Sequence, residues 1–259
     1  MQRLISAFVG AAIILLAVWY AGMPLLFLTG VIVIFGIGEA VELLFRVGFR
    51  PSLALAEAGG LILLAGAYLH PEGYPGAAVT LLLFLNFMVS LFFYPRYRLS
   101  DLAATVFAPL YIGLLYYFYW ISALDSGWVY LIFLFTATWA CDTFAFVVGR
   151  NFGRVRFIPE LSPKKTFEGT LAGIIGSVLV GCVFAYLYPF LVPSKIILLA
   201  LMLGITAFLG DLMASSLKRQ AGVKDSGTII PGHGGVLDRF DSLLFTAPLV
   251  YYYAVLLIP

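Results

Sequence analysis

One polar segment near the carboxyl end, residues 215–241, concentrates side chains that bind phosphate and cations. It lies between two apolar runs and holds four basic residues, three aspartates, five glycines and one of the chain's two histidines. Lysine and arginine match phosphate oxygens, glycine lets backbone N–H groups approach a bulky anion, and clustered carboxylates favour a cation such as Mg²⁺. The combination predicts phosphate chemistry.

The order of these residues closely resembles the signature of phosphatidate cytidylyltransferases, also called CDP-diglyceride synthetases. From Ser215 to Asp241 it reads S-x-L-K-R, then K-D-x-G, then P-G-H-G-G-V-x-D-R-F-D. We call residues 215–241 the signature segment. The resemblance implies an Mg²⁺-dependent nucleotidyltransferase of phospholipid biosynthesis, which makes CDP-diacylglycerol and pyrophosphate from CTP and phosphatidic acid.

A second polar block occupies residues 142–169. It reads D-T-F-A-F-x-x-G-R-x-F-G and, after a gap, S-P-K-K-T-F-E-G. By itself such a basic stretch is explained by attraction to anionic lipid headgroups. It also looks like a second conserved block of the same family, so the motifs of the resemblance cover residues 142–241. Asp142 falls inside an apolar run, where a buried carboxylate needs a partner.

Both blocks supply residues for the predicted reaction. An oxygen of the lipid phosphate attacks the α-phosphorus of CTP and pyrophosphate leaves, so the protein must position two anions and neutralise their charge. The predicted catalytic residues are Lys218, Arg219, Lys224, Asp225, His233 and Arg239. The predicted ligands of the substrate phosphates are Arg150, Lys164, Lys165, Ser215, Ser216, Gly234 and Gly235. His233 either donates to a phosphate oxygen, shuttles a proton or only shapes the glycine-rich loop.

Three aspartates are the predicted metal ligands. Asp238 and Asp241 are three residues apart at the start of a predicted helix and share one face, while Asp211 ends the preceding apolar run. Mg²⁺ is commonly held by one or two carboxylates together with substrate phosphates and water. The alternative for Asp238 and Asp241 is a favourable interaction with the helix dipole. The residues leave open whether a second metal ion is bound, and whether Asp225 adds a ligand or orients Lys224.

Composition places this chemistry in a membrane. The chain is 63% hydrophobic and 11% charged, against about 25% charged in soluble proteins. It has no basic arm that would indicate nucleic acid. A bilayer is crossed by about 20 apolar residues, and a backbone in lipid must satisfy its own hydrogen bonds. Nine apolar runs predict an all-α polytopic membrane protein with about nine transmembrane helices: residues 4–20, 25–45, 53–69, 76–94, 102–120, 127–149, 170–191, 196–212 and 243–258.

The distribution of charge predicts the orientation. With nine spans, all of the 15 Lys and Arg residues except Lys195 lie on the side of the amino terminus. The positive-inside rule makes that side cytoplasmic. We expect a polar cleft at the cytoplasmic ends of the carboxyl-terminal helices, where CTP meets phosphatidic acid. Because no transit or retention signal is seen, we choose a bacterial-type plasma membrane, and the resemblance suggests a homodimer.

These helices divide into two predicted domains. Residues 1–125 would hold helices one to five, a scaffold that also offers surfaces for subunit contacts. Residues 126–259 would hold catalytic helices six to nine, with cytoplasmic loops at 150–169 and 213–242. In the scaffold, Glu39, Glu42 and Arg46 favour an ion-pair stripe at a helix end over a functional site. Glu57 must face other helices or a wet cavity.

Two alternative functions stay open from the residues. One is a CTP-dependent polyprenol or phytol kinase, in which a lipid alcohol attacks the γ-phosphorus and a base must activate the hydroxyl. The other is a membrane transporter, which would carry charged residues at the bilayer midplane and broken helices in paired halves. The charges of this chain gather instead at one face of the predicted bundle.

Overall fold

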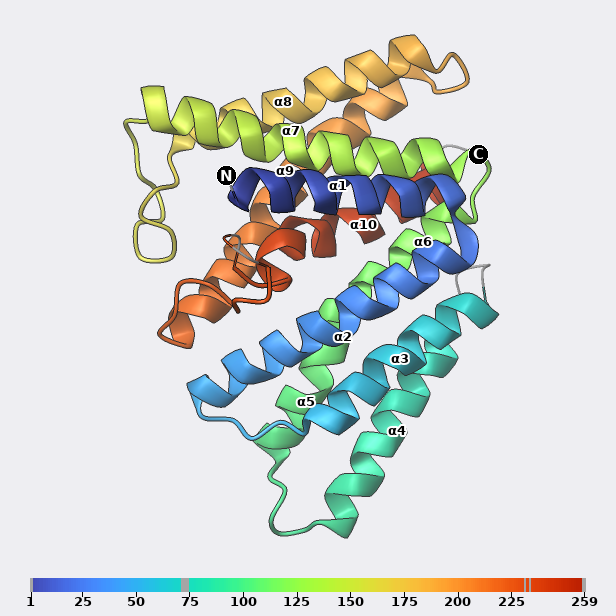
Figure 1. The fold of residues 1–259 in the computed structure, drawn as a ribbon, viewed down its shortest axis with the longest axis vertical. Helices are drawn as coiled ribbons and strands as arrows, with labels where there is room; N and C mark the ends of the chain where they lie inside the picture. Colours follow the sequence, from blue (N-terminus) through green and yellow to red (C-terminus); the bar gives the residue numbers. More distant parts are fainter. Residues whose placement is uncertain (1, 71–74, 231, 233, 258–259) are drawn as a thin grey trace. The chain divides into compact units, whose positions relative to one another are not determined.

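The computed structural model describes residues 2–70, 75–230, 232 and 234–257, and these residues are mainly helical (Figure 1). The described part contains no strand, only an isolated β-bridge between Ile230 and Gly234. The predicted all-α class is confirmed. The helices are α1 (Gln2–Tyr20), α2 (Gly22–Val47), α3 (Leu53–Leu69), α4 (Gly76–Phe92), α5 (Leu99–Ile112), the 3₁₀ helix η1 (Gly113–Tyr116), α6 (Tyr117–Ser122), α7 (Gly127–Phe152), α8 (Phe167–Leu187), α9 (Pro193–Gln220) and α10 (Leu237–Leu257).

Six helical stretches are long and apolar enough to cross a membrane. They are Gly22–Val47, Leu99–Ser122, Gly127–Phe152, Phe167–Leu187, Pro193–Gln220 and Leu237–Leu257. Three shorter apolar helices cover Phe8–Tyr20, Leu53–Leu69 and Gly76–Phe92. Every predicted apolar run therefore corresponds to helix in the described residues, but the total of nine spans and their orientation stay predictions.

The chain forms two compact units. The first comprises residues 1–125 and 217–240, and the second comprises residues 126–216 and 241–259. Most of the signature segment, which we expected to belong with the carboxyl-terminal helices, thus packs with the amino-terminal ones. The assignment of scaffold and catalytic roles to residues 1–125 and 126–259 stays a prediction.

In the first unit, small residues of α3 allow neighbouring helices to approach closely. A Cβ on Gly59 would lie 2.9 Å from Leu82 of α4 and 3.1 Å from Pro109 of α5. Gly66 faces Ala78 of α4 in the same way, at 2.6 Å. Side chains at these positions would force the helices apart, so α3 packs through small residues.

In the second unit, glycines bring α7 and α8 together. A Cβ on Gly169 would lie 2.8 Å from the carbonyl oxygen of Ala145, and one on Gly173 would lie 2.8 Å from that of Cys141. The connection between these helices ends at Thr166, whose Oγ1 accepts a hydrogen bond from the Gly169 N–H (3.2 Å) and caps α8. This cap fixes the chain directly after Lys165.

Candidate functional site

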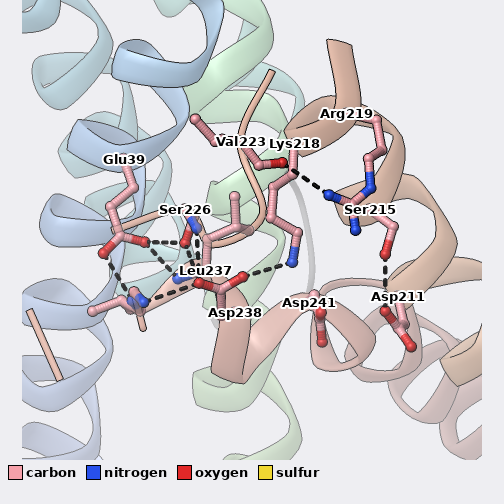
Figure 2. Close-up of polar contacts among 12 residues, drawn as sticks. Glu39, Asp211, Ser215, Lys218, Arg219, Val223, Ser226, Leu237, Asp238 and Asp241 are labelled. Atoms are coloured by element: carbon pink, nitrogen blue, oxygen red, sulfur yellow. Dashed lines mark hydrogen bonds and ion pairs between the residues drawn. The ribbon is translucent and has the colours of Figure 1, made fainter. Parts of the chain in front are cut away.

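Lys165, Asp211 and Ser215 form a polar cluster in the second unit, which we call the Lys165 cluster. The Lys165 Nζ lies 2.6 Å from Asp211 Oδ2. The Ser215 hydroxyl donates to Asp211 Oδ1 at 3.3 Å (Figure 2). The side chains of Lys165 and Asp211 are 19% and 34% exposed. Asp211 and Ser215 are four residues apart on α9 and share one face, so the structure brings a basic residue of the second block to the helix that leads into the signature segment.

Helices α9 and α10 touch backbone to backbone beside this cluster. A Cβ on Gly210 would lie 2.7 Å from the Asp241 carbonyl oxygen and 3.1 Å from the Ser242 Cα. The absence of a side chain at Gly210 therefore lets α10 approach α9 at the level of Asp211. One Asp241 oxygen accepts a hydrogen bond from the Ser242 N–H (2.7 Å). Asp211 and Asp241 thus come from two helices in close contact.

Lys218, Asp238, Ser226 and Gly235 form the Lys218 cluster in the first unit. The Lys218 Nζ donates to Asp238 Oδ1 at 2.6 Å, and the two side chains are only 11% and 5% exposed. Asp238 Oδ2 accepts hydrogen bonds from the backbone N–H of Ser226 (2.8 Å) and of Gly235 (3.0 Å) (Figure 2). The Ser226 hydroxyl oxygen lies 3.0 Å from the same carboxylate oxygen. Asp238 therefore holds both ends of the loop between α9 and α10.

The glycines of the loop are explained by these contacts. Gly234 has φ +85°, a left-handed backbone that favours glycine, and its Cβ would lie 2.7 Å from Asp238 Oδ2. A Cβ on Gly235 would collide with Glu39 Oε2 and Ser226 Oγ. We predicted phosphate contacts for both glycines, and those contacts stay a prediction. The structure gives each glycine a packing reason that needs no ligand.

Glu39 of α2 is the residue that sequence reasoning misjudged. Its carboxylate is 6% exposed and accepts hydrogen bonds from Ser226 Oγ and from the backbone N–H groups of Val236 and Leu237, each at 2.8 Å. The ion-pair interpretation holds for Glu42 and Arg46, 3.0 Å apart, but is wrong for Glu39. A signal was present: the positions three and four residues from Glu39 hold no basic residue, so no ion pair along the helix could form.

A cavity of about 640 Å³ lies beside the loop within the first unit. Its walls include Lys224 and Asp225 from the signature segment and Glu42 and Arg46 from α2. This volume falls in the range of small-molecule sites, about 300–1,000 Å³. A second cavity of about 310 Å³ is lined by Glu57 together with residues of α2, which confirms that Glu57 faces other helices or a cavity.

The remaining predicted residues are less enclosed. Arg150, Lys164, Lys224, Asp225 and Arg239 are exposed. The Arg150 guanidinium lies 6.0 Å from the centroid of the Phe146 ring, and Arg219 donates to the Val223 carbonyl at 3.2 Å. Asp142, which we expected to be buried, is exposed on α7. Ser216 is half-buried near the end of α9, and His233 lies outside the described residues.

The predicted metal ligands differ in how well their surroundings suit a cation. Asp211 and Asp241 offer carboxylates from two touching helices, although Asp211 is also occupied, by Lys165 at 2.6 Å and by Ser215 at 3.3 Å. Asp238 already accepts hydrogen bonds from Lys218 and from two backbone N–H groups, and the Ser226 hydroxyl oxygen lies 3.0 Å away. Among the described residues, no group of three or more His, Cys, Asp or Glu side chains could hold a metal ion. The convergence of three aspartates on one cation stays a prediction.

Comparison with known proteins extends the resemblance beyond the two motif blocks. A model of the Cytidylyltransferase family matches residues 1–257. The phosphatidate cytidylyltransferase of Synechocystis sp. is 34% identical over 294 residues, which cover 100% of this chain and 97% of that protein. The Bacillus subtilis protein of the same name is 33% identical over 267 residues, covering 97% and 96%. The one from Staphylococcus haemolyticus is 39% identical over 156 residues, 60% of each chain. The chain belongs to the Cytidylyltransferase family.

Proposed function

We propose that this protein is a phosphatidate cytidylyltransferase, which transfers the cytidylyl group of CTP to phosphatidic acid and yields CDP-diacylglycerol and pyrophosphate. Relatives with this name align with nearly the whole chain. Six helices suited to a membrane agree with a lipid substrate. Neither the polyprenol kinase nor the transporter is favoured, because the matched relatives are named for cytidylyl transfer.

The observation that carries the proposal is that two lysines of the motif blocks are each paired with an aspartate. Lys165 is held by Asp211 and Lys218 by Asp238. An ammonium group has three N–H donors, so each lysine keeps donors for phosphate oxygens after its aspartate is bound. Asp211 and Ser215 are four residues apart on α9 and therefore share one face of that helix.

In the proposed reaction a phosphatidate oxygen attacks the α-phosphorus of CTP. A new P–O bond forms as the bond to the bridging oxygen of pyrophosphate breaks, and the electron pair leaves with pyrophosphate. Lys165 in the second unit and Lys218 in the first would each bind phosphate oxygens and neutralise part of their charge. Their aspartate partners fix where the ammonium groups point before substrate arrives. Asp211 and Asp241 would hold Mg²⁺, which when bound neutralises charge on the nucleotide phosphates.

The 640 Å³ cavity is the proposed place for CTP in the first unit. Lys224 and Arg46 on its walls are positive groups suited to phosphate, and Asp225 and Glu42 are acceptors for the hydroxyl or amino groups of a nucleoside. Arg219, Arg239, Lys164 and Arg150 would add exposed positive charge that attracts both anions.

We further propose that the protein lies in a plasma membrane with its amino terminus and signature segment in the cytoplasm, where CTP is found. If the chain crosses the membrane nine times, all Lys and Arg residues except Lys195 lie on the side of the amino terminus, and the positive-inside rule makes that side cytoplasmic. A homodimer is proposed from the family resemblance alone.

The function is tested by assaying the purified protein in detergent with Mg²⁺, CTP and phosphatidic acid. The proposal expects pyrophosphate and CDP-diacylglycerol in equal amounts, and loss of both in Asp241→Asn. Diacylglycerol and a polyprenol serve as control substrates. Release of CDP with phosphate moved to a lipid alcohol would select the kinase, and a folded protein without turnover on any lipid would reject nucleotidyl transfer.

A further inference from the structure

We infer that Glu39 is a positioning residue for the proposed reaction: its buried carboxylate fixes Ser226 of the loop and the start of α10, which carries Asp238. The inference rests on the proposed function for its catalytic consequence, although the contacts themselves do not depend on it. Glu39 lies in the carboxyl-terminal half of α2, outside both motif blocks. Its three donors are 187 to 198 residues away in the sequence, in the signature segment.

The carboxylate joins two parts of the loop. Oε1 accepts from the Val236 N–H, while Oε2 accepts from the Leu237 N–H and the Ser226 hydroxyl, each at 2.8 Å (Figure 2). Ser226 Oγ also lies 3.0 Å from Asp238 Oδ2. A chain of contacts therefore runs from Glu39 through Ser226 to Asp238 and on to Lys218.

A negative charge is suited to this position. Helix α10 begins at Leu237, and the first N–H groups of a helix have no acceptor within the helix. Glu39 supplies acceptors for the N–H groups of Val236 and Leu237, and its charge interacts favourably with the positive end of the α10 dipole. An amide at residue 39 would turn an N–H₂ group toward at least one of these donors.

Two loop glycines leave room for the carboxylate. The three atoms nearest to a Cβ on Gly227 all belong to Glu39, the closest at 2.6 Å. A Cβ on Gly235 would meet Glu39 Oε2 as well. Neither glycine has the positive φ that would itself demand glycine. Both positions are therefore explained by close packing against Glu39.

The first test compares Glu39→Gln with Asp101→Asn. Asp101 is a matched control, because it is also a buried carboxylate of the first unit (5% exposed) and accepts backbone N–H groups, from Arg50 at 2.8 Å and Arg98 at 3.3 Å. Residues that orient metal ligands typically contribute about 10- to 100-fold to metal affinity or activity, and we expect a similar factor for a residue that orients Asp238. We expect Glu39→Gln to lower kcat by this factor with little change in the KM for CTP. Asp101→Asn should lower the thermal midpoint but keep a kcat near that of the wild type.

A second test uses the glycine. Gly227→Ala should lower kcat in the wild-type background by pushing the carboxylate away. In a Glu39→Ala background the same change should cost little, because the colliding atoms are gone, so the two substitutions should be strongly non-additive. Additive losses would show that Gly227 serves another purpose and would overturn the inference, as would equal kcat losses in Glu39→Gln and Asp101→Asn.

Trypsin gives a readout that does not need turnover. Lys224 and Arg239 are exposed in and after the loop, and a loosened loop should be cut about tenfold faster at these residues in Glu39→Gln. If the wild type makes no CDP-diacylglycerol, the proposed function is wrong. The cleavage rates still test whether Glu39 holds the loop in place. If Glu39→Gln does not fold, Ser226→Ala replaces it: reduced kcat and faster cleavage are expected, and wild-type values for both would overturn the inference.

Discussion

The Lys218 ammonium and the Asp238 carboxylate form an ion pair, 2.6 Å apart, with side chains that are 11% and 5% exposed. Burying two charges is costly, and their attraction offsets this cost only while both are present. Asp238 also binds the loop through Ser226 and Gly235. The pair therefore stabilises the loop that carries three of the predicted catalytic residues, Lys224, Asp225 and His233.

Replacing only Lys218 should destabilise the protein more than replacing Lys218 and Asp238 together. Lys218→Met leaves the Asp238 charge without its cation, and we expect a loss of about 3–5 kcal/mol in the free energy of unfolding. Lys218→Met with Asp238→Asn should recover most of this loss, because the amide oxygen still accepts from the loop N–H groups, yet should stay inactive. Chemical denaturation in detergent measures both. Equal stability of the single and double variants would contradict the prediction.

Lys164 and Lys165 should differ although they are neighbours. Lys165 is bound to Asp211 and Lys164 is exposed. Loss of one preorganised donor at a reacting phosphate costs about 10²- to 10³-fold, so Lys165→Ala should lower kcat/KM by this amount. Lys164→Ala should have a smaller effect, mainly on KM, because an exposed lysine acts through screened attraction. Steady-state kinetics with CTP and phosphatidic acid decide between them, and a larger loss in Lys164→Ala would refute the assignment.

Gly210→Ala should separate α9 from α10. Its Cβ would lie 2.7 Å from the Asp241 carbonyl oxygen, so the helices must move apart. Overpacking of this kind costs about 1–3 kcal/mol, and the activity should fall because Asp211 and Asp241 move away from each other. Gly10→Ala is the control: nothing lies within 4 Å of its Cβ in α1, and it should be neutral or slightly stabilising. The unfolding midpoint and kcat of both variants test this.

Removal of Mg²⁺ should abolish turnover, and the two aspartates should set how much Mg²⁺ is needed. We expect EDTA to stop pyrophosphate release and added Mg²⁺ to restore it. Asp211→Asn and Asp241→Asn should each shift half-maximal activity to higher Mg²⁺, by about 10-fold or more, since each removes one charged ligand. Titration of Mg²⁺ at saturating CTP measures the shift. An unchanged Mg²⁺ requirement in both variants would show that Asp211 and Asp241 are not the metal ligands.

Cysteine labelling should test the orientation and the number of spans. After Cys141 and Cys182 are replaced by Ser, we expect Arg154→Cys to react with an impermeant maleimide only from the cytoplasmic side and Ser126→Cys only from the other. Arg50 precedes the short helix α3 and Tyr68 lies in its last turn, so Arg50→Cys and Tyr68→Cys should react from opposite sides if α3 crosses the membrane. Labelling of both from one side would show fewer spans than the nine predicted.

Much of the site chemistry could be read from the sequence. The motif residues from Asp142 to Asp241 indicated the family, and a family match over residues 1–257 confirmed it. Lys165, Asp211 and Ser215, predicted separately, lie in one cluster. The sequence did not indicate that Lys165 pairs with Asp211 or that Lys218 pairs with Asp238. Lys218 was predicted to be catalytic and Asp238 to bind a metal, and the structure joins them directly.

The sequence alone determined the helical class and the membrane character, because both depend on local properties: the length of each apolar run and the need of a backbone in lipid to satisfy its own hydrogen bonds. Only the tertiary structure decided the partners of Glu39. Its ligands lie 187 to 198 residues along the chain, and a buried carboxylate is stabilised by whichever donors the fold brings within about 3 Å. No pattern within α2 specifies those donors, whereas the Glu42–Arg46 pair, four residues apart on one helix, was predictable.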